Sequence, residues 1–110
     1  MDYKTIANDR IVEEEIKKSR FICHLRRISN EEEGREYIAQ IKKKHHKASH
    51  SCSAMIVGED GQIKRSSDDG EPSGTAGVPM LTVLEKQGLT NVVAVVTRYF
   101  GGIKLGAGGL

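Results

Sequence analysis

The feature that most restricts the fold of this chain is a nearly unbroken apolar run at residues 92–96, Val-Val-Ala-Val-Val. A strand with one face in water alternates apolar and polar residues, whereas a strand buried on both faces is apolar throughout. The run is therefore predicted to be a central strand, covered on both faces. The 110 residues suffice for one domain around it.

Residues 10–28 are predicted to form two strands, joined by a turn at residues 17–20. The apolar residues of the second strand, Phe21, Cys23 and Leu25, alternate with polar ones. Residues 51–57 and 62–67 form a second pair of predicted strands, separated by a glycine-bounded turn.

Residues 30–45 are predicted to be a helix. Ser29 is the expected N-terminal cap, glutamates fill the first turn and lysines fill the last, where each charge complements the helix dipole. A second helix is predicted to begin near Val78 and to end at Gly88. Together these elements predict an α+β domain.

Charge and composition exclude several classes of protein. The net charge of +2 does not by itself indicate a nucleic-acid-binding protein, although residues 1–47 hold twelve of the seventeen basic residues and nine of the fifteen acidic ones. Such mixed signs are typical of a solvated face. Neither a signal peptide nor an apolar run of about 20 residues is found, so no membrane contact is predicted and a cytoplasmic location is expected.

A glycine-rich loop at residues 68–77 leads into the second predicted helix. Backbone N–H groups at a helix N-terminus attract anions, and the hydroxyls of Ser73 and Thr75 would add donors beside Gly74 and Gly77. The alternatives are a structural loop in which Thr75 caps the helix, or a Mg²⁺ site. The weak candidates for metal ligands are Asp68, Asp69 and Glu71.

Basic and aromatic residues follow the central strand, at residues 98–109. Arg98, Tyr99 and Lys104 beside Gly101 and Gly102 are the groups that RNA or a phosphate-rich surface requires for charge contact and stacking. The structural alternative is that Phe100 packs into the core while the glycines permit close backbone approach. The segment lacks the Gly-Lys-Ser/Thr of a P-loop, and no cofactor is predicted.

A third group contains His45, His46, His50 and Cys52. Zinc binding is disfavoured because no Cys-x₂-Cys partner exists, and no further residues complete a nucleophilic site around Cys52. His50 is instead predicted to donate a hydrogen bond at the edge of the glycine-rich loops. No catalytic residue is assigned.

Three motifs of this sequence resemble the IMPACT/YigZ family, also called UPF0029. They are His-x-Cys-x-Ala at residues 50–54, Asp-Asp-Gly-Glu-Pro-Ser-Gly-Thr-Ala-Gly-Val-Pro at 68–79, and Val-Thr-Arg-Tyr-Phe-Gly-Gly-Ile-Lys-Leu-Gly-Ala-Gly-Gly-Leu at 96–110. The last two are long and unusual, so the resemblance is highly specific, and it extends from residue 18 to the end.

The resemblance implies a two-layer α/β sandwich like domain 2 of ribosomal protein S5 and domain IV of elongation factor G. It also implies a helix directly after Leu110 and a ferredoxin-like C-terminal domain beyond it. Eukaryotic relatives are translation regulators that bind the activator of the general-control kinase. Fold alone is a weak guide to function.

The leading hypothesis is a non-enzymatic module that contacts RNA, the ribosome or a translation-regulatory protein. It requires the bends at residues 70–77 and 98–109 to converge on one side, with Arg98 and Lys104 accessible and the basic residues 42–47 assisting. The alternative is an enzyme or binding protein for a phosphorylated small molecule or nucleotide, using the glycine loops with Asp68 and Asp69. A third hypothesis is a protein-interaction module without nucleic acid.

Overall fold

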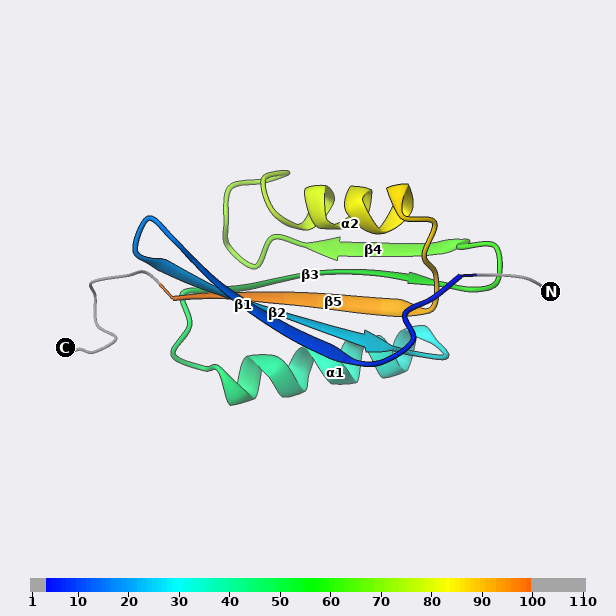
Figure 1. The fold of residues 1–110 in the computed structure, drawn as a ribbon, viewed down its shortest axis with the longest axis horizontal. Helices are drawn as coiled ribbons and strands as arrows, with labels where there is room; N and C mark the ends of the chain where they lie inside the picture. Colours follow the sequence, from blue (N-terminus) through cyan, green and yellow to red (C-terminus); the bar gives the residue numbers. More distant parts are fainter. Residues whose placement is uncertain (1–3, 100–110) are drawn as a thin grey trace.

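The computed structural model describes residues 4–99, which form one five-stranded antiparallel sheet and two helices (Figure 1). The strand order is β1-β2-β5-β3-β4. In chain order the elements are β1 (Arg10–Ile16), β2 (Ser19–Arg27), α1 (Glu31–Lys44), β3 (His50–Val57), β4 (Ile63–Ser67), α2 (Gly77–Lys86) and β5 (Val92–Tyr99). The α+β class predicted from the sequence is confirmed.

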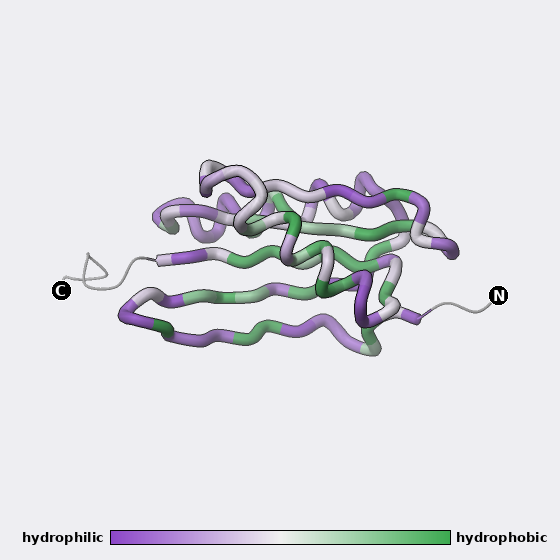
Figure 2. The backbone as a smooth tube through the Cα atoms, turned by 90° about the horizontal axis from the view of Figure 1, so that it is seen from above, coloured by the Kyte–Doolittle hydropathy of each residue, from purple (hydrophilic) through white to green (hydrophobic). Residues whose placement is uncertain are grey.

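Strand β5 is the centre of the sheet, between β2 and β3. Val92, Val93 and Val95 have no exposed surface, which confirms the central strand predicted from the apolar run. Figure 2 shows the hydrophobic residues gathered in the inner strands β5 and β3, while much of the edge strand β1 is hydrophilic. Burying a valine side chain contributes roughly 1.5–3 kcal/mol, so β5 supplies a large share of the core's stability.

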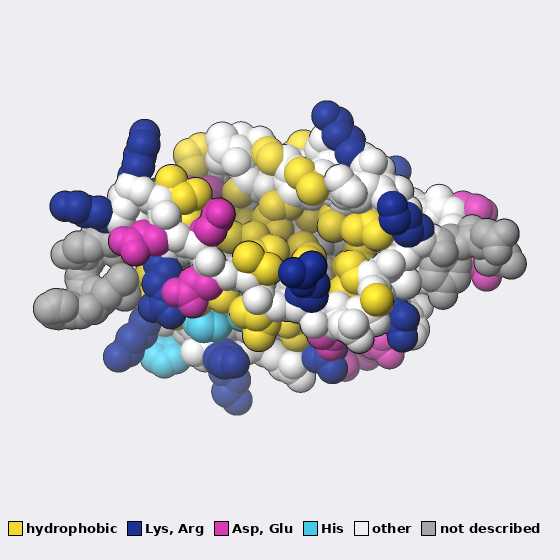
Figure 3. Space-filling model, viewed as in Figure 1, with side chains coloured by type: hydrophobic (Ala, Val, Ile, Leu, Met, Phe, Trp, Pro, Cys, Tyr) yellow, Lys and Arg dark blue, Asp and Glu magenta, His cyan; other side chains and the backbone are white. Residues whose placement is uncertain are grey.

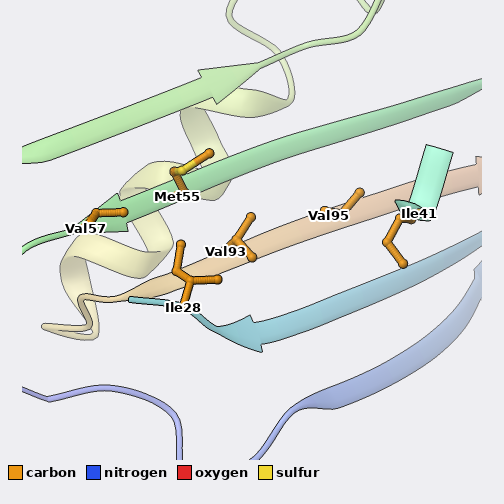
Figure 4. Close-up of a cluster of buried hydrophobic side chains, with 6 residues drawn as sticks. All are labelled: Ile28, Ile41, Met55, Val57, Val93 and Val95. Atoms are coloured by element: carbon orange, nitrogen blue, oxygen red, sulfur yellow. The ribbon is translucent and has the colours of Figure 1, made fainter. Parts of the chain in front are cut away.

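The two helices cover opposite faces of the sheet. Val93 and Val95 belong to the cluster beneath α1, and Val92 and Ala94 belong to the cluster beneath α2. Figure 4 shows the first cluster on the face of the sheet turned away from α2. This arrangement differs from the expected two-layer sandwich, because an apolar strand buried on both faces requires a layer on each side.

Helix α1 is capped one residue later than predicted. The Asn30 side chain accepts a hydrogen bond from the Glu33 backbone N–H at 2.8 Å, and the Glu33 carboxylate accepts one from the Ser29 N–H at 2.7 Å. Ser29 therefore lies outside the helix and is not its cap. The helix turns Ile41 and Gly34 toward the sheet, where both are buried.

Replacing the cap tests this correction. Asn30→Ala should lower the free energy of unfolding by about 1 kcal/mol, because the Glu33 N–H loses its acceptor. Ser29→Ala keeps the backbone hydrogen bond and should change the stability by less than about 0.5 kcal/mol. Urea denaturation of both variants measures the difference, and equal losses would contradict the assignment.

Candidate functional site

The loop of residues 68–77, which joins β4 to α2, is organised around the carboxylate of Asp68. This carboxylate accepts hydrogen bonds from the backbone N–H groups of Gly74, Ala76 and Gly77 at 2.9, 3.1 and 2.7 Å. The bonds, that of Gly77 foremost, lower the pKa of Asp68. The amides predicted to bind an external anion thus already hold an internal one, and a ligand would have to displace it.

Glycines in this loop meet steric demands of the backbone. Gly70 and Gly74 adopt φ values of +90° and +79°, a region that side chains rarely enter. A Cβ on Gly77 would lie 2.7 Å from the backbone nitrogen of Ser67, so α2 begins in direct contact with the end of β4. The Thr75 hydroxyl donates to the Pro72 carbonyl at 2.5 Å and makes no cap hydrogen bond to α2, whose N-cap residue is Ala76.

Asp69 joins the loop to α1 and β3. Its carboxylate accepts a 2.6 Å hydrogen bond from the Ser51 N–H and lies 3.0 Å from the Lys42 ammonium. The Asp69 carbonyl lies 2.9 Å from Nδ1 of His50, which must donate because a carbonyl only accepts. This is the hydrogen bond predicted for His50 at the loop edge.

Glu71 joins the loop to β5 through Arg98. Its carboxylate lies 3.2 Å from a guanidinium nitrogen of Arg98, and the two side chains are only 15% and 29% exposed. The guanidinium also lies 5.5 Å from the ring centre of Phe21 on β2. Arg98 is therefore held against an internal acid and an aromatic ring, and a ligand would compete with both.

The three loop carboxylates point to three different partners. Asp68 binds amides, Asp69 binds Lys42, and Glu71 binds Arg98. Within residues 4–99 no group of three or more potential ligands is placed to hold a metal ion. In the same part of the chain no helix is long and apolar enough to cross a membrane.

Arg98 and Tyr99, predicted to act together, lie on opposite faces of the sheet because successive side chains of a strand alternate. The Tyr99 hydroxyl lies 2.7 Å from Nδ1 of His45, at the end of α1. The Arg20 guanidinium lies 5.6 Å from the Tyr99 ring centre. Tyr99 thus joins β2, β5 and α1 on the face opposite Arg98.

A buried histidine lies beside this junction. His24 is 2% exposed, and its ring lies 5.3 Å from that of His45. Burial lowers the pKa of both histidines, and the neighbouring Lys44 lowers them further. Both rings are therefore favoured in their neutral form.

Cys52 lacks the properties of a nucleophile. Burial, with the carboxylate of Glu71 adding to it, raises the pKa of its thiol to about 11, and the thiol donates to the Asp68 carbonyl at 3.2 Å. A thiolate is scarce at neutral pH under these conditions.

A mostly apolar hollow of about 470 Å³ lies between α2 and the sheet, next to the Glu71–Arg98 pair. Figure 3 shows hydrophobic side chains gathered in the recess on this face. Its lining residues are Phe21, Cys52, Glu71, Pro72, Thr75, Ala76, Met80, Val96 and Arg98.

Not every predicted site residue can be placed. Gly101, Gly102 and Lys104 lie outside the described residues. Ser73 and Thr75 are exposed on the loop, and the Thr75 hydroxyl already donates its proton to the Pro72 carbonyl. Sequence reasoning missed Phe21 as a partner of the site, because only the strand register brings it beside Arg98. Lys42, expected to assist the site with the other basic residues of 42–47, is paired with Asp69.

Comparison with known proteins identifies the family. The model of the Impact N-terminal domain matches residues 17–110. The chain is 65% identical to IMPACT family member YvyE of Bacillus subtilis over 86% of this chain and 44% of that protein. It is 48% identical to IMPACT family member YigZ of Escherichia coli over 90% of this chain and 50% of that protein.

Two solved structures share the fold. A crystal structure of a hypothetical protein matches with a TM-score of 0.84 and 45% identity, over 96% of this chain and 52% of that one. The two-domain translational regulator Yih1 matches with a TM-score of 0.66 and 26% identity, over 96% and 42%. The chain belongs to the IMPACT family, as its motifs indicated, and it spans about half the length of these bacterial relatives.

Substitution of Gly77 tests the contact between α2 and β4. Gly77→Ala should lower the free energy of unfolding by about 1–3 kcal/mol, because the new Cβ meets backbone atoms of Ser67 that cannot move aside alone. Ser73→Ala, on the exposed part of the same loop, is the control and should change little. Chemical denaturation measures both, and an unchanged Gly77→Ala would contradict the contact.

The buried histidines predict a pH dependence of stability. Their pKa values are lowered below 6.5 in the folded state, so the unfolded state binds more protons as the pH falls. Stability should be fully present above about pH 6.5 and decline below it, by at most about 1.4 kcal/mol per pH unit for each extra proton. Denaturation curves at pH 7.5 and 5.5 measure this.

The control for the pH experiment is His46→Gln, which alters an exposed neighbour. It should leave the pH dependence intact, whereas His24→Gln should reduce it. A stability that is flat across this range in the unaltered protein would show that neither histidine is protonated differently in the two states.

Proposed function

We propose that this chain is a non-enzymatic binding module that contacts the ribosome, its RNA or a factor of translation. The similarity to the translational regulator Yih1 across 96% of the chain carries the proposal. The site geometry supports binding over catalysis, since its carboxylates are engaged in internal contacts and its buried thiol is held protonated.

The finer part of the proposal concerns fold and site. The domain would be a variant of the fold of ribosomal protein S5 domain 2 and elongation factor G domain IV. The binding surface would be the end of the sheet where β5 finishes, with Arg98 and the 68–77 loop on one face, Tyr99 on the other, and Lys104 as a further contact. Hydrogen bonds and ion pairs from Asp69 and Glu71 support this surface by fixing the loop to the end of β5 and the start of β3.

Further chain is also part of the proposal. A helix after Leu110 would cover the apolar hollow beside α2, and a ferredoxin-like domain would follow it. The hollow supports a helical occupant because its lining is largely apolar and α2 covers only one side of this face of the sheet.

Co-sedimentation tests the proposal. The full-length protein that contains this chain should pellet with bacterial ribosomes, and filter binding should detect association with ribosomal RNA that weakens steeply between 50 and 200 mM salt. Lys104→Ala should weaken the association, because one phosphate contact is lost. Failure to associate with ribosomes and RNA at any salt concentration would overturn the proposal.

A parallel thermal-shift screen with nucleotides and Mg²⁺ distinguishes the proposed function from the alternative, binding of a phosphorylated small molecule or nucleotide. A tight ligand must raise Tm, because it binds only the folded state. A clear rise with one nucleotide, together with no ribosome association, would favour that alternative.

A further inference from the structure

Five of the seven exposed lysines that form no ion pair within residues 4–99 share one end of the sheet, whereas Lys42 and Lys64 are paired with Asp69 and Glu85. They come from two segments far apart in sequence, the β1–β2 turn and the end of α1. They are named here the lysine end and are Lys17, Lys18, Lys43, Lys44 and Lys47.

Tyr99 brings the two segments to one end of the sheet. Arg20, two residues after the turn, is paired with Tyr99 in the strand register and lies 5.6 Å from its ring centre. The Tyr99 hydroxyl contacts His45 at 2.7 Å, directly after the lysines of α1. Figure 1 shows the β1–β2 turn, the C-terminal end of α1 and the end of β5 at the same end of the molecule.

The acids nearest these lysines are largely engaged elsewhere. Glu13 is paired with Arg20, Asp69 with Lys42, and Glu71 with Arg98. Glu14 and Glu15 on the edge of β1 offset part of the lysine charge. The exposed ammonium groups are thus available to an external anion, while Arg98 is not the most accessible cation at this end.

The β1–β2 turn holds its two lysines in an unfavourable backbone conformation. Ile16 pairs with Ser19, so the loop has two residues, and Lys17 and Lys18 adopt φ values of +50° and +69°. Two positive φ values define a type I′ hairpin, for which Asn-Gly is the preferred sequence. Each non-glycine residue here costs stability, and such local strain is typical of positions kept for function.

We propose that the lysine end binds the phosphate backbone of RNA, an inference that rests on the proposed function and assigns its main contacts to residues other than Arg98. Lysine is a point charge on a flexible stem and needs no fixed acceptor geometry, which suits a sequence-independent contact with phosphates. Ile16 is the one exposed large apolar side chain beside the β1–β2 turn in the described residues, and the end of α1 adds none, which falls short of the apolar centre that a stable protein interface requires.

The turn permits a test that does not weaken the fold. Lys17→Asn with Lys18→Gly in the full-length protein should keep or raise Tm, because the turn relaxes. Binding of single-stranded ribosomal RNA fragments should weaken about tenfold near 150 mM salt, and the slope of log affinity against log salt should fall by about 1.4, for two lost phosphate contacts.

A second variant, Lys43→Gln with Lys44→Gln and Lys47→Gln, should weaken binding further without touching the turn. The control is Lys4→Gln with Lys86→Gln, two exposed lysines of the opposite end, which should leave affinity and slope unchanged.

The outcomes separate this inference from the proposed function. Suppose that the unaltered protein binds ribosomes and that the lysine variants bind RNA as tightly as the unaltered protein does. The assignment of RNA binding to the lysine end is then wrong, and the proposed function stands. Equal weakening by the control variant, or association only with a protein and without salt dependence, also overturns the inference. Absence of any ribosome or RNA binding by the unaltered protein overturns both.

Discussion

The burial of β5 on both faces is the constraint on which the rest of this structure depends. Its valines divide alternately between the cluster under α1 and the cluster under α2. The same alternation continues to the end of the strand, where Arg98 and Tyr99 point to opposite faces. The strand that holds the core together thus also determines which helix each residue of the candidate site meets.

The acids of the 68–77 loop act as internal ligands. Asp68 neutralises the N-terminus of α2, Asp69 holds the ends of α1 and β3, and Glu71 holds the end of β5. A loop without regular structure is therefore fixed at three points, by charge-assisted bonds that are stronger than neutral ones. The charges of the loop are therefore largely used within the protein.

Periodicity predicted the elements well because it depends on local physics. Alternation located β2, the apolar run located β5, and charge placement located α1. The cap was misplaced by one residue because Ser29 and Asn30 are both good caps, and only tertiary geometry chooses between them. The two-layer arrangement implied by the family resemblance differs from the observed one, in which α1 and α2 cover opposite faces of the sheet. The apolar run of β5 already indicated that both faces are covered.

The site was harder to predict because its partners are distant in sequence. Nothing near Arg98 indicates that Glu71 and Phe21 will hold its guanidinium, since this follows from the register of three strands. The split of Arg98 from Tyr99 follows from strand alternation and was within reach of sequence reasoning. The loop amides do bind an anionic group, as their position before a helix indicated. The sequence does not reveal that this group is the carboxylate of Asp68.

The distribution of charge matters more here than the net charge of +2. At physiological salt the Debye length is about 8 Å, so a partner senses the charges close to its own contact and not the sum over the protein. Arg20, Lys42 and Arg98 form ion pairs with carboxylates of the protein itself. The lysine end, whose lysines form no ion pair among the described residues, adds positive charge here that Glu14 and Glu15 offset only in part. A nearly neutral domain can therefore have a local excess of positive charge.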